Sequence, residues 1–217
     1  MFRRNQRTRV RGRRRASANW FTRVRALLAG ALVLGVGSTL TLAAWTDSEY
    51  AQATFTASTF GIIGSTDGTN FSEHATGATA AALTFVATPT GMSPGVTTYA
   101  KYTVKTTTAT NVGGTALMAA PTVTGSGLGT YLRYGVSTID AAAGTACNAT
   151  TFGTGNLVAA GSALTTAPPT ATTQALSAGG ANAAAYCIAV TLPAGTANAA
   201  QGLNATLAWT ITATSTS

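Results

Sequence analysis

The sequence contains one histidine, His74, which follows Glu73 and is where acid–base or metal chemistry would have to be centred. A catalytic zinc takes about three protein ligands, commonly two histidines four residues apart with an acidic base on the same helix. No second histidine is present. A serine hydrolase would have to combine His74 with an acid such as Asp67 or Asp140, but the sequence has no G-x-S-x-G turn. We therefore expect a protein that is not an enzyme and has no catalytic residues, metal site or cofactor.

Two cysteines, Cys147 and Cys187, are the other residues with distinctive chemistry. If the chain is exported, their even number favours one disulfide, because thiols oxidise outside the cytoplasm. The bond would close a loop of about 40 residues and stabilise the fold by roughly 3–4 kcal/mol in the chain-entropy account. The alternative is a pair of buried free thiols.

The charge distribution argues against a nucleic-acid partner. The net charge of +8 first suggests one, but ten of the thirteen basic residues lie within Met1–Arg25. From Trp45 onward three basic residues face five acidic ones, a net charge of −2: Lys101, Lys105 and Arg133 against Asp47, Glu49, Asp67, Glu73 and Asp140. So few charges oppose self-association only weakly.

The first 44 residues have the organisation of a signal peptide. A basic region, Met1–Arg25, precedes an uncharged apolar region, Ala26–Ala44. The basic residues would hold that end on the cytoplasmic side. The small pair Ala43-Ala44 predicts cleavage between Ala44 and Trp45. The alternative is a retained anchor, since a helix of this apolar length spans about 28 Å, just enough to cross a bilayer.

The residues around this boundary resemble the TasA/camelysin family. The resemblance rests on the small pair Ala43-Ala44, the aromatic Trp45, the acidic stretch Asp47-Ser48-Glu49 and the motif Ala53-Thr54-Phe55. A second patch, Met92–Val104, contains Ser-Pro-Gly followed by Tyr-x-x-Tyr-x-Val, and the stretch Leu192–Leu203 is similar to actinobacterial members. Roughly 124–185 resembles nothing that we can name.

The resemblance implies a secreted fibre or biofilm-matrix protein of the cell surface. It implies release by a SipW-type signal peptidase that cuts before Trp45, a jelly-roll domain and a mature N-terminus that donates a strand. Camelysin is described as a metalloprotease, so a surface metalloprotease is one alternative, disfavoured here by the single histidine. Besides the signal peptidase, the partner that we expect is a second copy of the chain. We expect contact with a membrane only through an uncleaved signal segment.

The exported part shows alternation of apolar and polar residues and almost no helical periodicity. With recurrent Gly and Pro turns, this pattern predicts an all-β fold, a single β-sandwich over 61–217. The clearest strand is Leu203–Ala213, expected to be long and central. Other expected strands are Tyr186–Leu192, Leu132–Val136 and Ala100–Val104, with shorter ones at Leu83–Ala87, Leu117–Val123, Asn156–Ala160 and Thr172–Leu176. The alanine runs Ala141–Ala143 and Ala181–Ala185 are expected to be loops.

The segment 45–60 has no helical stripe and carries an aromatic residue every five positions: Trp45, Tyr50, Phe55 and Phe60. Small residues, including Ala53, flank Phe55 on one face of an extended chain. This pattern suits a donor strand that pairs with a sheet edge of a neighbouring copy, which repeated head to tail gives a filament. Alternatively, Ala51–Phe60 is the first strand of its own sheet and Phe55 a core residue.

These observations lead to one preferred function and two others. We expect a secreted structural protein that forms fibres by strand donation. The second hypothesis is a monomeric surface adhesin or binding module, in which Tyr99, Tyr131 and Tyr134 would form a ligand platform. The third is the camelysin-type protease.

The cleavage hypothesis makes a direct prediction. If a signal peptidase cuts after Ala44, N-terminal sequencing of the protein from the culture medium should begin at Trp45. A chain that stays in the cell envelope with Ala26–Ala44 intact would contradict it.

Overall fold

The computed structural model describes residues 18–39, 47–85, 91–153 and 155–216, and the chain forms two compact units, Met1–Thr54 and Phe55–Ser217. The first unit contains the helix α1, Ala18–Thr39, whose apolar side chains, such as Leu28 and Leu32, are exposed. Among the described residues, no helix combines the length and the apolar character needed to cross a membrane. The predicted cleavage pair, Ala44 and Trp45, lies outside the described residues.

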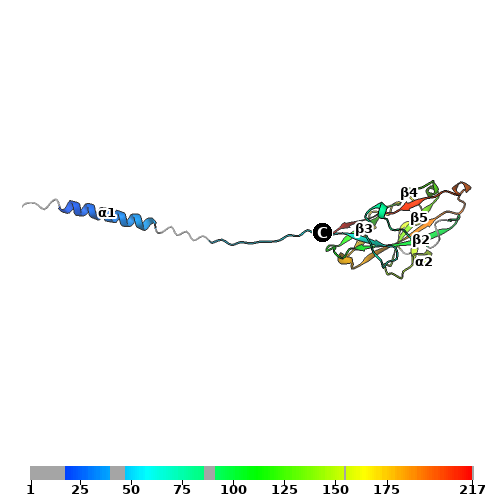
Figure 1. Ribbon diagram of the computed structural model, residues 1–217, viewed down its shortest axis with the longest axis horizontal. Helices are drawn as coiled ribbons and strands as arrows, with labels where there is room; N and C mark the ends of the chain where they lie inside the picture. Colours follow the sequence, from blue (N-terminus) through cyan, green and yellow to red (C-terminus); the bar gives the residue numbers. More distant parts are fainter. Residues whose placement is uncertain (1–17, 40–46, 86–90, 154, 217) are drawn as a thin grey trace, which may run out of the picture. The chain divides into compact units, whose positions relative to one another are not determined.

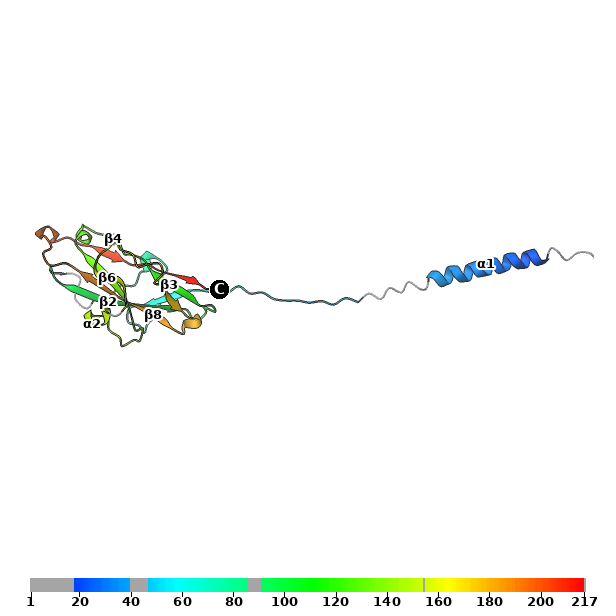
Figure 2. The ribbon, with the colours of Figure 1, turned by 180° about the vertical axis from the view of Figure 1, so that it is seen from behind.

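The second unit is built on a five-stranded antiparallel sheet (Figures 1 and 2). Its spatial order is β1-β2-β8-β5-β6, so β8 is central, with β2 and β5 beside it. The bounds are β1 Ile62–Ser65, β2 Thr97–Thr106, β5 Arg133–Ile139, β6 Asn156–Ala163 and β8 Ala183–Thr191. The pairing of β2 with β8 is the longest ladder, running from Thr97 opposite Thr191 to Lys105 opposite Ala183.

A second layer is formed by two smaller sheets, whose strands follow one another along the chain: β3 is followed by β4, and β9 by β10. One has the order β10-β3-β7, with β10 Ile211–Ser215, β3 Gly114–Met118 and β7 Gln174–Leu176. The other pairs β4, Thr122–Thr124, with β9, Thr206–Ala208. Pro121 precedes β4 and has no N–H to donate. Between the two ladders, the side of β3 and β4 holds one residue more than the side of β9 and β10, so the register shifts there, as in a β-bulge.

The main hydrophobic core combines side chains from both layers. The five-stranded sheet contributes Tyr134, Tyr186 and Ile188, and the second layer contributes Met118 and Leu176; all five are at most 2% exposed. This arrangement confirms the all-β prediction. The expected faces on β2, β5 and β8 lie in this core, as the alternation predicted. The single β-sandwich and its jelly-roll connectivity stay predictions.

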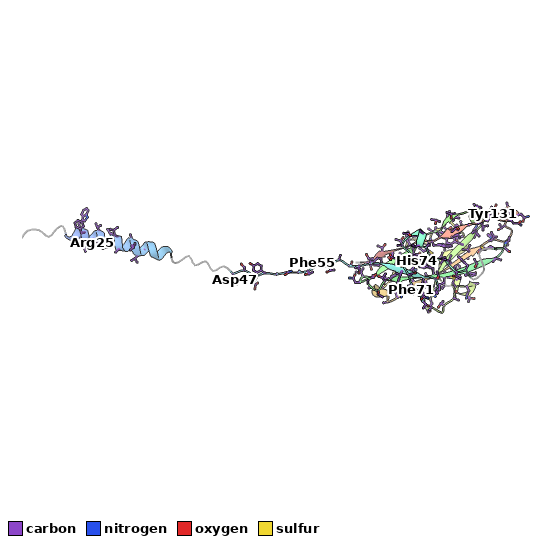
Figure 3. All side chains as sticks on the ribbon, in the orientation of Figure 1. Arg25, Asp47, Phe55, Phe71, His74 and Tyr131 are labelled. Atoms are coloured by element: carbon purple, nitrogen blue, oxygen red, sulfur yellow. A yellow bond between two sulfur atoms is a disulfide. The ribbon has the colours of Figure 1, made fainter. Side chains whose placement is uncertain are left out.

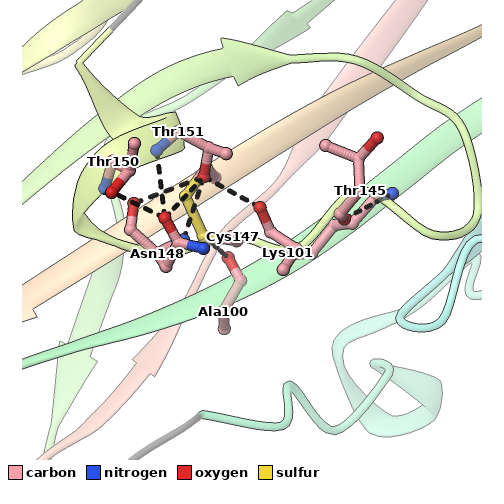
Figure 4. The surroundings of a disulfide bond; sticks show 9 residues. Ala100, Lys101, Thr145, Cys147, Asn148, Thr150 and Thr151 are labelled. Atoms are coloured by element: carbon pink, nitrogen blue, oxygen red, sulfur yellow. Dashed lines mark hydrogen bonds between the residues drawn. A yellow bond between two sulfur atoms is a disulfide. The ribbon is translucent and has the colours of Figure 1, made fainter.

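The outer face of the central strands is covered by the loop after β5, which contains the short helix α2, Ala149–Phe152 (Figure 4). The predicted disulfide is confirmed: Cys147 in this loop is bonded to Cys187 in β8, with 5.2 Å between their Cα atoms. Phe152 packs in the same cluster. Asn148 caps α2 by accepting hydrogen bonds from the N–H groups of Thr150 and Thr151. The disulfide thus fixes the cover to the strand that it covers.

Several expected strands have different bounds. The stretch Leu203–Ala213 is not one central strand: it holds β9 and part of β10, each paired on one side only, and its apolar face is only half-buried. Ala183–Ala185 begin β8 and are not a loop. No strand is present from Leu83 to Phe85, and the rest of that stretch lies outside the described residues. The remaining short elements are single turns: η1 Gly77–Thr79, η2 Leu128–Thr130, η3 Ala178–Gly180 and η4 Asn198–Ala200.

Removal of the disulfide should destabilise the domain. Replacing both cysteines with alanine should lower the free energy of unfolding by about 3–4 kcal/mol, because the 40-residue loop is no longer constrained in the unfolded chain. Urea denaturation followed by circular dichroism measures the change. A reducing agent should lower the free energy of unfolding of the native protein by a similar amount and leave that of the double variant unchanged. An equal effect on both proteins would contradict the prediction.

Candidate assembly site

The segment Asp47–Ser58 precedes the domain and belongs to no helix or strand (Figure 3). All of its residues are exposed, including Tyr50 at 96% and Phe55 at 92%. Among the described residues, its one hydrogen bond is local, from the Ser48 N–H to Asp47 Oδ1 at 2.9 Å. The alternative in which Ala51–Phe60 is the first strand of its own sheet and Phe55 a core residue is therefore wrong for this structure.

The chain is first held at Thr59–Gly61, against the turn between β2 and β3. The Thr59 N–H donates to Asn111 Oδ1 at 2.9 Å, and the Asn111 N–H donates back to the Thr59 carbonyl at 3.2 Å. The buried Thr110 hydroxyl accepts from the Gly61 N–H at 3.1 Å and lies 3.0 Å from the Gly61 carbonyl, to which it donates. We call this contact the anchor; it links residues about 50 positions apart in the sequence.

Phe60 completes the anchor by packing on Gly114 of β3. A Cβ atom at Gly114 would lie 2.6 Å from the Phe60 ring, so the ring occupies the space that a side chain would need. The predicted donor residues thus divide into two groups. Phe60 is half-buried in its own domain, whereas Tyr50, Ala53 and Phe55 are exposed, and Trp45 lies outside the described residues.

The anchor lies at the same end of the domain as the last described residues. The Thr216 N–H donates to the Gly113 carbonyl at 2.9 Å, next to the glycine on which Phe60 packs (Figure 1). Val123 and Thr124 of the next strand, β4, lie nine and ten residues after that glycine, roughly 30 Å away at the rise of a β-strand. The domain therefore has an anchor end and a far end.

Two grooves lie at the far end, on either side of the loop that contains η2; Tyr131, which follows η2, marks this end in Figure 3. The larger, about 570 Å³, is lined partly by the apolar side chains of Met92, Leu128, Leu192 and Leu203. The smaller, about 430 Å³, lies beside β4 and contains Arg133. The walls of both grooves come from segments far apart in the sequence, so no spacing within one segment predicts either groove.

The His74 ring makes its hydrogen bonds with residues of its own loop. The ring Nδ1 lies 2.7 Å from the Thr79 carbonyl, which can only accept, so Nδ1 carries a proton and Nε2 faces the Ser72 hydroxyl at 3.0 Å. Asp67 is held in its own turn, where the Asn70 and Thr69 N–H groups and the Ser65 hydroxyl lower the pKa of its carboxyl. Within the described part of the chain, no three potential metal ligands come together.

The tyrosine platform of the binding-module hypothesis is not present as expected. Tyr134 is fully buried, and its hydroxyl donates to the Thr166 carbonyl. Tyr99 is half-buried and packs on Phe152, with ring centroids 6.1 Å apart. Tyr131 is also half-buried. Alternation along β5 puts Tyr134 on the core face, which the exposed-platform hypothesis did not take into account.

Comparison with models of protein families gave no match to this chain, and no curated protein matches it. The resemblance to the TasA/camelysin family therefore stays a prediction carried by the residues around the leader boundary. The function of the chain has to be inferred from its own geometry.

The exposed segment predicts a proteolysis pattern. In dilute solution, chymotrypsin should cut the processed protein rapidly after Tyr50 and Phe55, and much more slowly after the anchored Phe60. Timed digestion followed by mass spectrometry would show a stable product that begins at Thr56. In an Asn111→Ala variant, cleavage after Phe60 should become faster, because the anchor loses the acceptor for the Thr59 N–H. Protection of Phe55 in a dilute monomer would contradict the prediction.

Proposed function

We propose that this chain is a secreted structural protein of the cell surface or biofilm matrix, and that copies of it assemble into fibres. In this proposal, the processed N-terminal segment of one copy adds as a β-strand to the domain of the next. The observation that carries the proposal is the exposure of Asp47–Ser58, with two large aromatic side chains, ahead of a firm anchor.

Burial of the aromatic side chains supplies the driving force. Tyr50 and Phe55 expose nearly all of their surface, and burying a large apolar side chain stabilises a complex by roughly 1.5–3 kcal/mol. The unpaired backbone of the segment adds hydrogen bonds when it meets a sheet edge. The small side chains of Ala51, Ala53 and Ala57 let the segment lie close to a neighbouring strand.

The position of the anchor favours an open assembly. The segment joins the domain at one end, while sheet edges and both grooves extend to the far end. A contact between two different surfaces is heterologous and continues from copy to copy unless a rotation closes it. A low charge density, with a net charge of −2 from Trp45 onward, opposes such stacking only weakly.

A monomeric surface binding module is the second candidate, and the larger groove favours it. Its volume of about 570 Å³ and its partly apolar lining are typical of sites for small ligands. Loss of the N-terminal segment would leave such a module's ligand affinity unchanged, because the groove is lined entirely by residues from Gly91 to Ala205.

Deletion of residues 45–55 should abolish filaments in negative-stain electron microscopy. Circular dichroism should show an unchanged melting temperature, because the hydrogen bonds that anchor the chain begin at Thr59. As a matched pair, Phe55→Asp should prevent assembly while Gln52→Asp, with the same added charge, should weaken it less. Filaments formed by the deleted protein would refute strand donation by this segment.

A further inference from the structure

The second layer of the domain is narrower at its far end than at its anchor end. At the anchor end, β3 lies between β10 and β7, but β7 pairs only with Gly114–Ala116. Further along, β4 pairs with β9 on one side, and within the described ranges no strand pairs with its other side. A stretch of β-edge is therefore open where β7 has ended.

The smaller groove lies along this open edge. Val123 of β4 is 43% exposed, and the groove passes from it to the end of β6 in the other layer. Three glycines contribute to its wall. The lining residues are Val123, Thr124, Gly125, Gly127, Gly129, Thr130, Arg133, Ala163, Leu164 and Thr165. The groove thus offers main-chain hydrogen bonds on one side and an apolar floor with one cation.

Arg133 is the cation with unused hydrogen-bonding capacity. Its Nη1 donates to the Leu132 carbonyl at 2.9 Å and more weakly to the Thr130 carbonyl at 3.4 Å, and no described carboxylate lies within ion-pair distance. A guanidinium has five donors, so several remain for a carboxylate. Lys101, in contrast, donates to the carbonyls of Ala142 and Thr145.

The exposed N-terminal segment carries the matching charge. Asp47 and Glu49 are two residues apart, so in an extended strand both carboxylates lie on one face, together with Phe55. The acids within the domain are placed differently. Asp67 and Asp140 accept hydrogen bonds inside their own turns, and Glu73 lies in the loop fixed to β1 through Ser72.

We propose that the open edge of β4 receives the N-terminal segment of a second copy, with Asp47 and Glu49 against Arg133. This inference rests on the proposed function and names the acceptor for it. The main chain of the segment would extend the second layer beside β4, and its Asp47 face would point into the groove. Because the anchor lies roughly 30 Å from β4, each copy has its donor and its acceptor at opposite ends.

Charge reversal tests the contact. In the full chain, exported and processed, Arg133→Glu should raise the protein concentration needed for filaments at least tenfold, because two carboxylates would then face a third. Asp47→Lys with Glu49→Lys should have a similar effect. The chain with all three substitutions should recover filaments near the wild-type concentration. Lys101→Glu, a reversal of a cation outside the groove, is the matched control and should leave the filament threshold within about twofold.

Mixing the two half-defective proteins tests whether the contact joins separate copies. Arg133→Glu keeps the acidic donor, and the double lysine variant keeps Arg133, so the donor of each variant has the opposite charge to the acceptor of the other, and together they should form filaments in which the two proteins alternate. Negative-stain electron microscopy of the mixture, compared with each variant alone at the same total concentration, shows whether these mixed filaments form. A mixture that stays monomeric overturns the inference.

The outcomes separate this inference from the proposed function. If Arg133→Glu forms filaments at the wild-type concentration while deletion of residues 45–55 abolishes them, the segment is the donor but the β4 groove is not its acceptor. If the deleted protein forms filaments, both fail. If the triple variant stays defective although its melting temperature is that of the wild type, the charge pairing is wrong.

Discussion

The burial of β8 on both of its faces is the constraint on which the domain depends. One face, including Tyr186 and Ile188, packs on the second layer, and the other carries Cys187 and Ala189 against the loop with α2. A strand buried on both sides needs a cover on each, and the outer cover here is short and contributes one large apolar side chain, Phe152. The disulfide supplies what hydrophobic contact alone would not, since it ties that cover directly to β8.

The two layers are unequal, and the inequality gives the domain its open surface. Five strands form the first sheet, whereas the second has three strands at one end and two at the other. Pro121 interrupts the ladder just where the layer narrows. Natural β-sheets normally protect their edges with charge, bulges or loops. Here the edge of β4 is bordered by a groove that contains Arg133.

Much of the fold could be predicted from the sequence, and the failures have identifiable causes. Alternation located the faces of β2, β5 and β8, because half of each strand must be apolar to build the core. For Leu203–Ala213 the same alternation led to a wrong prediction of a central strand. Alternation indicates that one face is buried, but it does not indicate whether a strand has a partner on each side. The alanines that begin β8 were not predicted as a strand because alanine has a low propensity for β-strands. Their small size nevertheless suits a strand that is closely covered on both faces.

The assembly site was only partly predictable. The aromatic spacing identified the segment, but the anchor joins Thr59 to Asn111 and Phe60 to Gly114, and contacts at that separation have no local signature. The groove at Arg133 was not predicted from the sequence, for a similar reason. It lies along an edge that is open because β7 is short. No spacing within β5 marks Arg133 as different from Lys101 or Lys105.

The anchor also sets the length of chain that extends ahead of the domain. Twelve residues, Asp47–Ser58, lie ahead of Thr59, and a fully extended chain of that length spans about 40 Å. In the proposed assembly, this span would limit how far one domain can lie from the domain that holds its segment. In an assembly of this kind, the axial repeat would be set by the length of the connector, while its affinity would be set by the side chains that the connector carries.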